Sequence, residues 1–212
     1  MDASRKTAIM VGVLFIIGTV AGSLCQVFTE PIRNAEDALV SVSANETPII
    51  LGALLWLTMG LALAMVPIVV FPILRKQNEA MALGYVVFRG GLETVAYMAT
   101  VVGWLALLPL SRVYQAGTPD ASNLKAWGDW LLRAEEIGSI STIVFCLGAL
   151  MFYYLLYRSK LIPRWLSGWG FISGVLYIVA NVVSMFSPLH LAPEIGVGIG
   201  FLLVPTAIQE MV

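Results

Sequence analysis

Two charged residues of opposite sign, Arg89 and Glu93, lie four residues apart in the apolar stretch 84–97, GYVVFRGGLETVAY. A charge in the middle of a bilayer costs at least about 2.5 kcal/mol, so such residues usually face a bundle interior or a watery cavity and have partners. An arginine can hold an anionic group, and a glutamate can accept a proton or a cation. The two residues therefore predict a polar ligand site inside a membrane.

Further polar side chains fall at similar depths in other apolar segments. The helical rise places Arg89 about 13 Å from the start of its helix and Glu210 at a matching depth, which predicts an ion pair between them. The Arg-then-Glu order of Arg89 and Glu93 is the weaker orientation for pairing on one helix, so a partner on another helix is expected. The predicted ligand-binding set is Arg89, Glu93, Glu135, Glu136, Glu210 and Asn181.

A structural alternative stays open for the same residues. Arginine and several acids can neutralise one another in a buried network that fixes helix register. Glu135 and Glu136 fall in the first turns of a helix, where acids are favoured by the helix dipole without any ligand.

Other kinds of chemistry have little support. Cys25 and Cys146 are far apart in apolar segments, and His190 is the one histidine, so no disulfide framework, metal site or bis-histidine haem is expected. There is no pairing of nucleophile and base, and no phosphate-binding loop. We therefore expect no cofactor, and a non-enzymatic role is favoured over catalysis. A net charge of −1 and dispersed basic residues argue against nucleic acid as a partner.

The composition is that of an integral membrane protein. Of 212 residues, 59% are hydrophobic and 12% are charged, and the mean hydropathy is +0.88, against about 25% charged residues in a soluble domain. We predict an all-α polytopic helix bundle forming a single transmembrane domain over 1–212. Its six transmembrane helices are expected at about 7–28, 47–74, 80–108, 132–157, 164–187 and 194–212. The first run is too long for the apolar part of a signal peptide, so it is expected to be retained as a span.

Two further segments have amphipathic patterns. Residues 31–42 predict a short helix on the membrane surface. In the second segment, Leu124, Trp127 and Leu131 are predicted to share one face, and Trp127 and Trp130 fit an interfacial aromatic belt. Glycines spaced six apart at 12/18, 84/90 and 168/174 suggest three tandem helical hairpins, although glycine is also common at membrane helix contacts.

The distribution of basic residues predicts the orientation. Seven basic residues fall on the side of the N-terminus and four on the other side. An excess of Lys and Arg in short loops marks the cytoplasmic side, so both termini are expected in the cytoplasm.

Several motifs resemble a bacterial family of integral membrane proteins, the domain of unknown function 4386. They are Gly84-Tyr85 with Phe88-Arg89 and Glu93, the run 148–159, GALMFYYLLYRS, and the run 163–170, PRWLSGWG. The resemblance extends over essentially the whole chain. It implies a multi-helix protein of the bacterial cytoplasmic membrane and no established activity. Family members continue past the position of Met211, so the last helix is expected to be short here.

The leading functional hypothesis is binding or translocation of a small molecule or ion at the buried Arg/Glu site. The first alternative is an accessory or scaffold subunit of a larger membrane complex, and the second is an intramembrane enzyme that acts on lipid. The expected partners are membrane lipids, an unidentified small ligand, and a membrane protein or a second copy of the chain.

Overall fold

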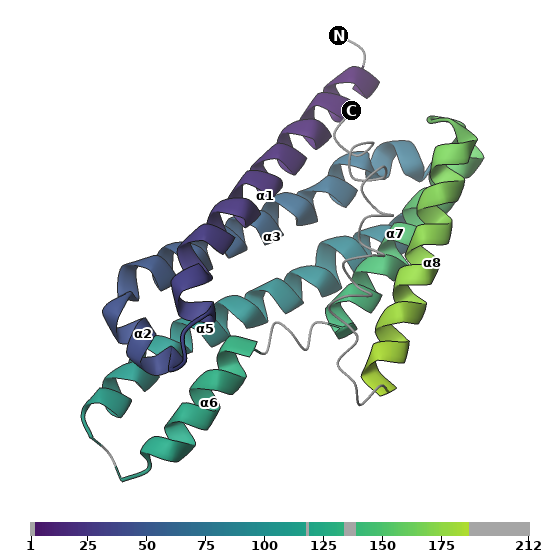
Figure 1. Cartoon of the computed structure of the whole chain (residues 1–212). Helices are drawn as coiled ribbons and strands as arrows, with labels where there is room; N and C mark the ends of the chain where they lie inside the picture. Colours follow the sequence, from purple (N-terminus) through teal and green to yellow (C-terminus); the bar gives the residue numbers. More distant parts are fainter. Residues whose placement is uncertain (1–2, 118, 134–138, 187–212) are drawn as a thin grey trace. The chain divides into compact units, whose positions relative to one another are not determined.

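The chain folds as α-helices joined by short connections (Figure 1). The computed structural model describes residues 3–117, 119–133 and 139–186, and these ranges contain no strand. The elements are α1 (Ala3–Arg33), α2 (Ala38–Ala44), α3 (Glu46–Leu74), α4 (Glu79–Tyr85), the π-helix η1 (Val86–Leu92), α5 (Glu93–Gln115), α6 (Ala121–Arg133), α7 (Ser139–Ser159) and α8 (Arg164–Phe186).

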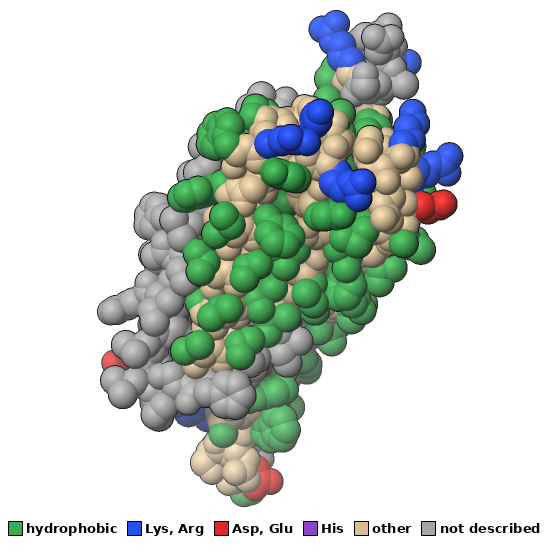
Figure 2. Space-filling model, turned by 90° about the vertical axis from the view of Figure 1, so that its right-hand side faces the viewer, with side chains coloured by type: hydrophobic (Ala, Val, Ile, Leu, Met, Phe, Trp, Pro, Cys, Tyr) green, Lys and Arg blue, Asp and Glu red, His purple; other side chains and the backbone are tan. Residues whose placement is uncertain are grey.

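Among the described residues, five helical stretches are long and apolar enough to cross a membrane. They are Arg5–Arg33, Glu46–Leu74, Glu79–Gln115, Ser141–Ser159 and Arg164–Val183, and the third joins α4, η1 and α5. Figure 2 shows one face of the molecule on which hydrophobic side chains predominate and basic side chains gather near one end. The predicted all-α membrane helix bundle is confirmed. The predicted sixth span, 194–212, lies outside the described residues.

Some helix boundaries differ from those predicted. The first helix continues through Pro31 to Arg33, so the predicted surface helix at 31–42 is replaced by the shorter α2. The third predicted helix does not end at Leu108, because α5 continues through Pro109 to Gln115. A proline removes only one backbone donor, and membrane helices tolerate it where neighbouring groups satisfy the released carbonyl. The fourth predicted helix, 132–157, covers the end of α6 and nearly all of α7, and residues 134–138 between them lie outside the described residues.

The chain divides into two compact units, which we describe separately. The first unit comprises Met1–Ile16, Ala62–Thr94 and Ser139–Val212, and the second comprises Ile17–Leu61 and Val95–Gly138. In the first unit, α7 packs against α8, α4 and η1. Its core contains Leu74, Ala82, Tyr85, Ala149, Tyr153, Leu155 and Leu156. The prediction of one domain over 1–212 stays a prediction.

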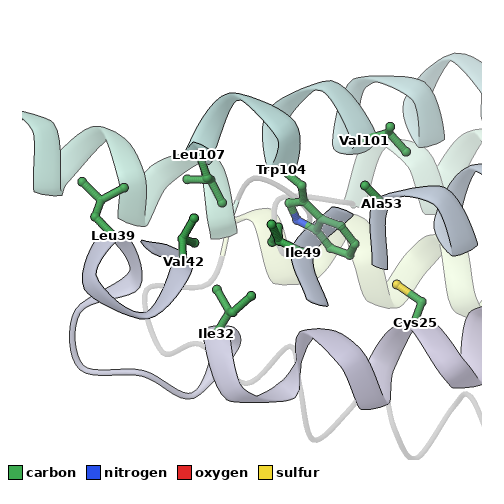
Figure 3. Packing of buried hydrophobic residues seen from close by; sticks show 9 residues of the cluster. All are labelled: Cys25, Ile32, Leu39, Val42, Ile49, Ala53, Val101, Trp104 and Leu107. Atoms are coloured by element: carbon green, nitrogen blue, oxygen red, sulfur yellow. The ribbon is translucent and has the colours of Figure 1, made fainter. Parts of the chain in front are cut away.

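The core of the second unit gathers side chains from α1, α2, α3 and α5. Cys25, Ile32, Leu39, Val42, Ile49, Ala53, Val101, Trp104 and Leu107 point toward one another there (Figure 3). The Trp56 ring packs against Trp104 at 5.6 Å and against Tyr97 at 5.8 Å between ring centroids. Large aromatic surfaces thus supply much of the burial in this unit.

Helix α6 packs on this core through Leu124 and Leu131, two residues of the face that the sequence predicts. Trp127 lies within about 60° of both leucines around the helix, so the three residues share one face, with Trp127 at its outer edge. Trp127 and Trp130 are 59% and 52% exposed. The two indoles form an edge-to-face pair at 5.8 Å on the outer side of α6, a position compatible with the predicted interfacial role.

Polar contacts join α2, α5 and α6 at one end of the second unit. Lys125 Nζ lies 3.2 Å from Asp37 Oδ2, and the Tyr114 hydroxyl donates to the same carboxylate at 3.0 Å. Partial burial by itself raises the pKa of Asp37. The hydrogen bond from the Val40 N–H and the contacts with Lys125 and Tyr114 lower it by more than burial raises it, so the net shift of the pKa is downward. The hydrogen bond with Asp37 raises the pKa of Lys125. Both shifts favour the charged pair at neutral pH.

The lowered pKa of Asp37 predicts a loss of stability in acid. A carboxyl whose folded pKa lies below its unfolded value of about 3.9 stabilises the fold above that pH, and the contribution is lost as the pH falls through the folded pKa. We expect Asp37→Asn to lower the melting temperature at pH 7 and the two melting curves to converge below about pH 4. Glu36→Gln, at an exposed neighbouring position, is the control. If the melting temperatures of wild type and Asp37→Asn differ as much at pH 3 as at pH 7, the lowered pKa of Asp37 is contradicted.

Candidate functional site

The predicted site lies where the longest apolar stretch changes its helical geometry. Residues 86–92 form the π-helix η1, in which the Glu93 N–H donates to the Phe88 carbonyl five residues earlier. The Thr94 hydroxyl donates to the Gly90 carbonyl at 2.7 Å and so satisfies an acceptor next to the irregular segment. Such π-helical insertions within α-helices are rare and frequently occur at functional sites.

Arg89 and Glu93 form an ion pair across the junction of η1 and α5. Both carboxylate oxygens of Glu93 accept from Arg89 Nη1, one of them at 2.6 Å. The two residues are only 7% and 2% exposed. The pair is thus formed within one continuous helical stretch despite the less favourable order of its charges. Removal from water strengthens the attraction but costs desolvation of both groups.

A second helix closes over the arginine. The Phe145 ring of α7 lies 4.5 Å from the guanidinium carbon, a cation–π contact. Gly148 lies one turn further along α7. A Cβ added there would lie 3.2 Å from the backbone nitrogen of Arg89 and 3.3 Å from its Cβ. The absence of a side chain at Gly148 therefore lets α7 approach the backbone of η1 closely.

Two small polar groups of the first unit are also buried. Cys146 on α7 is fully buried. Ser173 on α8 is 2% exposed. Cys25, in the second unit, is also fully buried.

The structure brings together only part of the predicted residue set. Asn181 lies on α8 in the same unit, where its Nδ2 donates to the Tyr177 carbonyl at 2.8 Å. Glu135, Glu136 and Glu210 lie outside the described residues, and so does the predicted pair of Arg89 with Glu210. The binding role of all six residues stays a prediction.

Sequence reasoning missed Phe145 and the close approach at Gly148. A phenylalanine in an apolar helix carries no signal of a cation–π contact, because that contact depends on the register of two helices. Gly148 belonged to a run singled out for its family resemblance, and glycine permits close helix contacts in membranes. That signal could have indicated packing against the arginine helix.

The bonds of this pair come from one guanidinium nitrogen. Arg89 Nη1 donates to both carboxylate oxygens of Glu93. A guanidinium can also bind a carboxylate or a phosphate through two nitrogens at once, which is its strongest mode. Among the described residues, no group of three or more His, Cys, Asp or Glu side chains could hold a metal ion.

Long apolar helices and a buried ion pair define the class of this molecule as an all-α integral membrane protein. Residues 10–212 match the family described as domain of unknown function 4386. The chain therefore belongs to that family, as its motifs suggested. No curated protein and no solved structure matches the chain.

Proposed function

We propose that this protein binds a small molecule or an ion at Arg89 and Glu93, within the membrane. The observation that carries the proposal is a buried pair of opposite charges in a π-helical interruption of an apolar span. Ionisable residues inside membrane segments mark ligand or ion pathways more often than not. Arg89 would hold an anionic group of the ligand, and Glu93 would take up a proton or a cation when the ligand displaces it.

The π-helical geometry supports exchange of partners at this site. One π-helical segment can return to α-helical hydrogen bonding with a local change of register, and Gly90 and Gly91 lie within it. A Cβ added at Gly91 would meet no atom within 4 Å, so there is room beside the backbone at this point. A local change there would move Arg89 relative to Phe145 without unfolding either helix.

The protein is proposed to lie in a bacterial cytoplasmic membrane, and the distribution of basic residues supports an orientation with both termini in the cytoplasm. The seven residues assigned to the inner side, Arg5, Lys6, Arg75, Lys76, Arg158, Lys160 and Arg164, all belong to the first unit. The four assigned to the outer side, Arg33, Arg112, Lys125 and Arg133, all belong to the second. Labelling of Lys76→Cys from one side of sealed vesicles would distinguish this orientation from its inverse.

Conservative variants of Arg89 and Glu93 test the site while keeping a side chain of similar size at each position. Purified protein is screened for small anions that raise its melting temperature, and the strongest of them is titrated against Arg89→Lys and Glu93→Gln. Loss of the two-nitrogen fork in Arg89→Lys should weaken binding by roughly a hundredfold, equivalent to about 2.7 kcal/mol. Glu93→Gln should also change the affinity for the anion, because an amide carries no negative charge to compete for Arg89.

The exposed ion pair of Arg112 and Glu46 offers the matched control. Its Nη2 to Oε2 distance is 2.9 Å, but the arginine side chain is 68% exposed. Arg112→Lys should leave ligand binding unchanged. A ligand that protects Arg89→Lys and wild type equally binds elsewhere, and this result would contradict the proposal.

A further inference from the structure

Two connections of the first unit carry five exposed basic residues. They are Arg75 and Lys76, between α3 and α4, and Arg158, Lys160 and Arg164, where α7 ends and α8 begins. A Cβ added at Gly84 of α4 would meet Met151 of α7, and five residues later Arg89 faces the earlier residue Gly148. The two helical stretches therefore run in opposite directions, and the end of α7 lies beside the start of α4. Both connections are thus at the same end of this unit.

The charge at this end is not neutralised within the part of the chain that the structure describes. There, none of the five cations forms an ion pair with a carboxylate. Glu79, at the start of α4, is the one acidic residue in the segments 75–79 and 158–164, and it has no ion pair either. Five positive charges against one negative charge make this end strongly attractive to an anion.

Two tyrosines of α7 hold the arginines on either side of the second connection. The guanidinium carbon of Arg158 lies 6.0 Å from the centre of the Tyr154 ring, and its Nη1 donates to the Tyr154 hydroxyl at 3.3 Å. The guanidinium carbon of Arg164 lies 5.4 Å from the centre of the Tyr157 ring. A ring orients a guanidinium without cancelling its charge, so both arginines remain able to bind an anion.

Apolar side chains are exposed among these cations. Leu161 and Trp165 are 57% and 72% exposed. The candidate spans Glu46–Leu74 and Ser141–Ser159 end at the two connections, and the span Arg164–Val183 begins at the second. The ends of spans lie at the level where headgroups meet acyl chains, and tryptophan is enriched there. A partner that supplies both negative charge and hydrocarbon matches this surface.

We propose that this end of the first unit binds an anionic phospholipid, such as phosphatidylglycerol, in the surrounding leaflet. The lipid phosphate binds Arg158 and Arg164, since guanidinium groups suit phosphate oxygens. The upper part of the acyl chains contacts Leu161 and Trp165, and Lys76 adds attraction from the other connection. The site is independent of the function proposed for the buried ion pair.

Lipid retention by the full chain tests this assignment. The protein is purified in mild detergent, mixed with equal amounts of phosphatidylglycerol and phosphatidylcholine of the same acyl chains, and analysed by native mass spectrometry. We expect phosphatidylglycerol to be retained roughly tenfold better. Arg158→Gln and Arg164→Gln should each lower its retention by roughly fivefold, equivalent to about 1 kcal/mol for one basic residue near an anionic lipid surface. Retention of phosphatidylcholine should change little.

A matched loss of charge in the second unit is the control. Arg112→Gln removes an exposed arginine there and should leave retention unchanged. Lys76→Gln, in the turn between α3 and α4, should weaken retention of phosphatidylglycerol, and it decides if neither arginine variant of the second connection folds. Equal retention of the two lipids by wild type, or equal behaviour of Arg164→Gln and Arg112→Gln, would overturn the assignment.

The ring contact of Arg164 provides a second test. Tyr157→Leu removes the ring and should lower retention of phosphatidylglycerol by roughly two- to fivefold, whereas Tyr157→Phe keeps the ring and should bind like wild type. Equal losses in both variants would show that the ring does not position Arg164.

Soluble competitors distinguish a lipid from other anionic partners. Glycerol 3-phosphate has the phosphate without acyl chains, and polyglutamate represents an acidic protein surface. Neither should displace phosphatidylglycerol at equal concentration. Displacement by glycerol 3-phosphate would show that the headgroup alone is bound, and displacement by polyglutamate would favour an acidic protein partner, so either result would overturn the proposal.

Discussion

Replacing Glu93 by alanine is expected to destabilise the protein by about 3–5 kcal/mol, because it leaves a buried arginine without its carboxylate. Arg89 is only 7% exposed and is covered by Phe145 of α7. The guanidinium cannot lose its proton at any accessible pH, so it cannot escape the penalty by becoming neutral. Heat denaturation in detergent, followed by aggregation or by circular dichroism, measures the loss.

Removing both charges together gives the informative comparison. A double variant, Arg89→Met with Glu93→Leu, replaces the pair by apolar groups of similar size and should be close to wild type in stability. Glu46→Ala, which breaks the exposed pair with Arg112, should have little effect. A double variant as unstable as Glu93→Ala would mean that the pair is required for folding. A stable double variant that binds no ligand would mean that the charges are kept for function.

The burial of Arg89 and Glu93 could be predicted from residue types, but the helical geometry around them could not. Charges are so unfavourable inside a bilayer that Arg89 and Glu93 stood out from composition alone. The pair lies at the junction of η1 and α5. The π-helical turn there forms where one residue more than usual is fitted between two α-helical segments. Hydrophobic periodicity averages over many residues and does not detect a change of a single residue in register.

Helix ends show a second limit of sequence reasoning. Pro31 was placed at the start of a separate surface helix and Pro109 just beyond the end of a span, yet α1 and α5 continue through them. In water a proline within a helix usually ends or kinks it. In a membrane, continuing the helix satisfies the remaining backbone groups, and leaving them unpaired in hydrocarbon would cost more than one missing hydrogen bond. The tendency of proline to end a helix is therefore outweighed by the need to satisfy the other backbone groups inside the bilayer.

Glycine contacts between α7 and α8 give the second large predicted effect. An added Cβ at Gly170 would lie 2.8 Å from Cδ1 and Cε1 of Tyr153, whose ring is rigid and only 3% exposed. We expect Gly170→Ala to destabilise the protein by about 1–3 kcal/mol, because the ring or the whole helix must move. The same melting experiment as above measures the loss.

Gly168, two residues earlier on the same helix, is the matched control. An added Cβ there would meet nothing within 4 Å. Alanine is favoured over glycine in a helix by up to about 1 kcal/mol, so Gly168→Ala should leave stability unchanged or raise it. A loss of stability in Gly170→Ala, together with an unchanged or higher stability in Gly168→Ala, would show that α8 is held against α7 through the contact between Gly170 and Tyr153. Equal changes at the two positions would show instead that helix propensity alone determines the effect, and the close packing that supports Tyr153 would have to be revised.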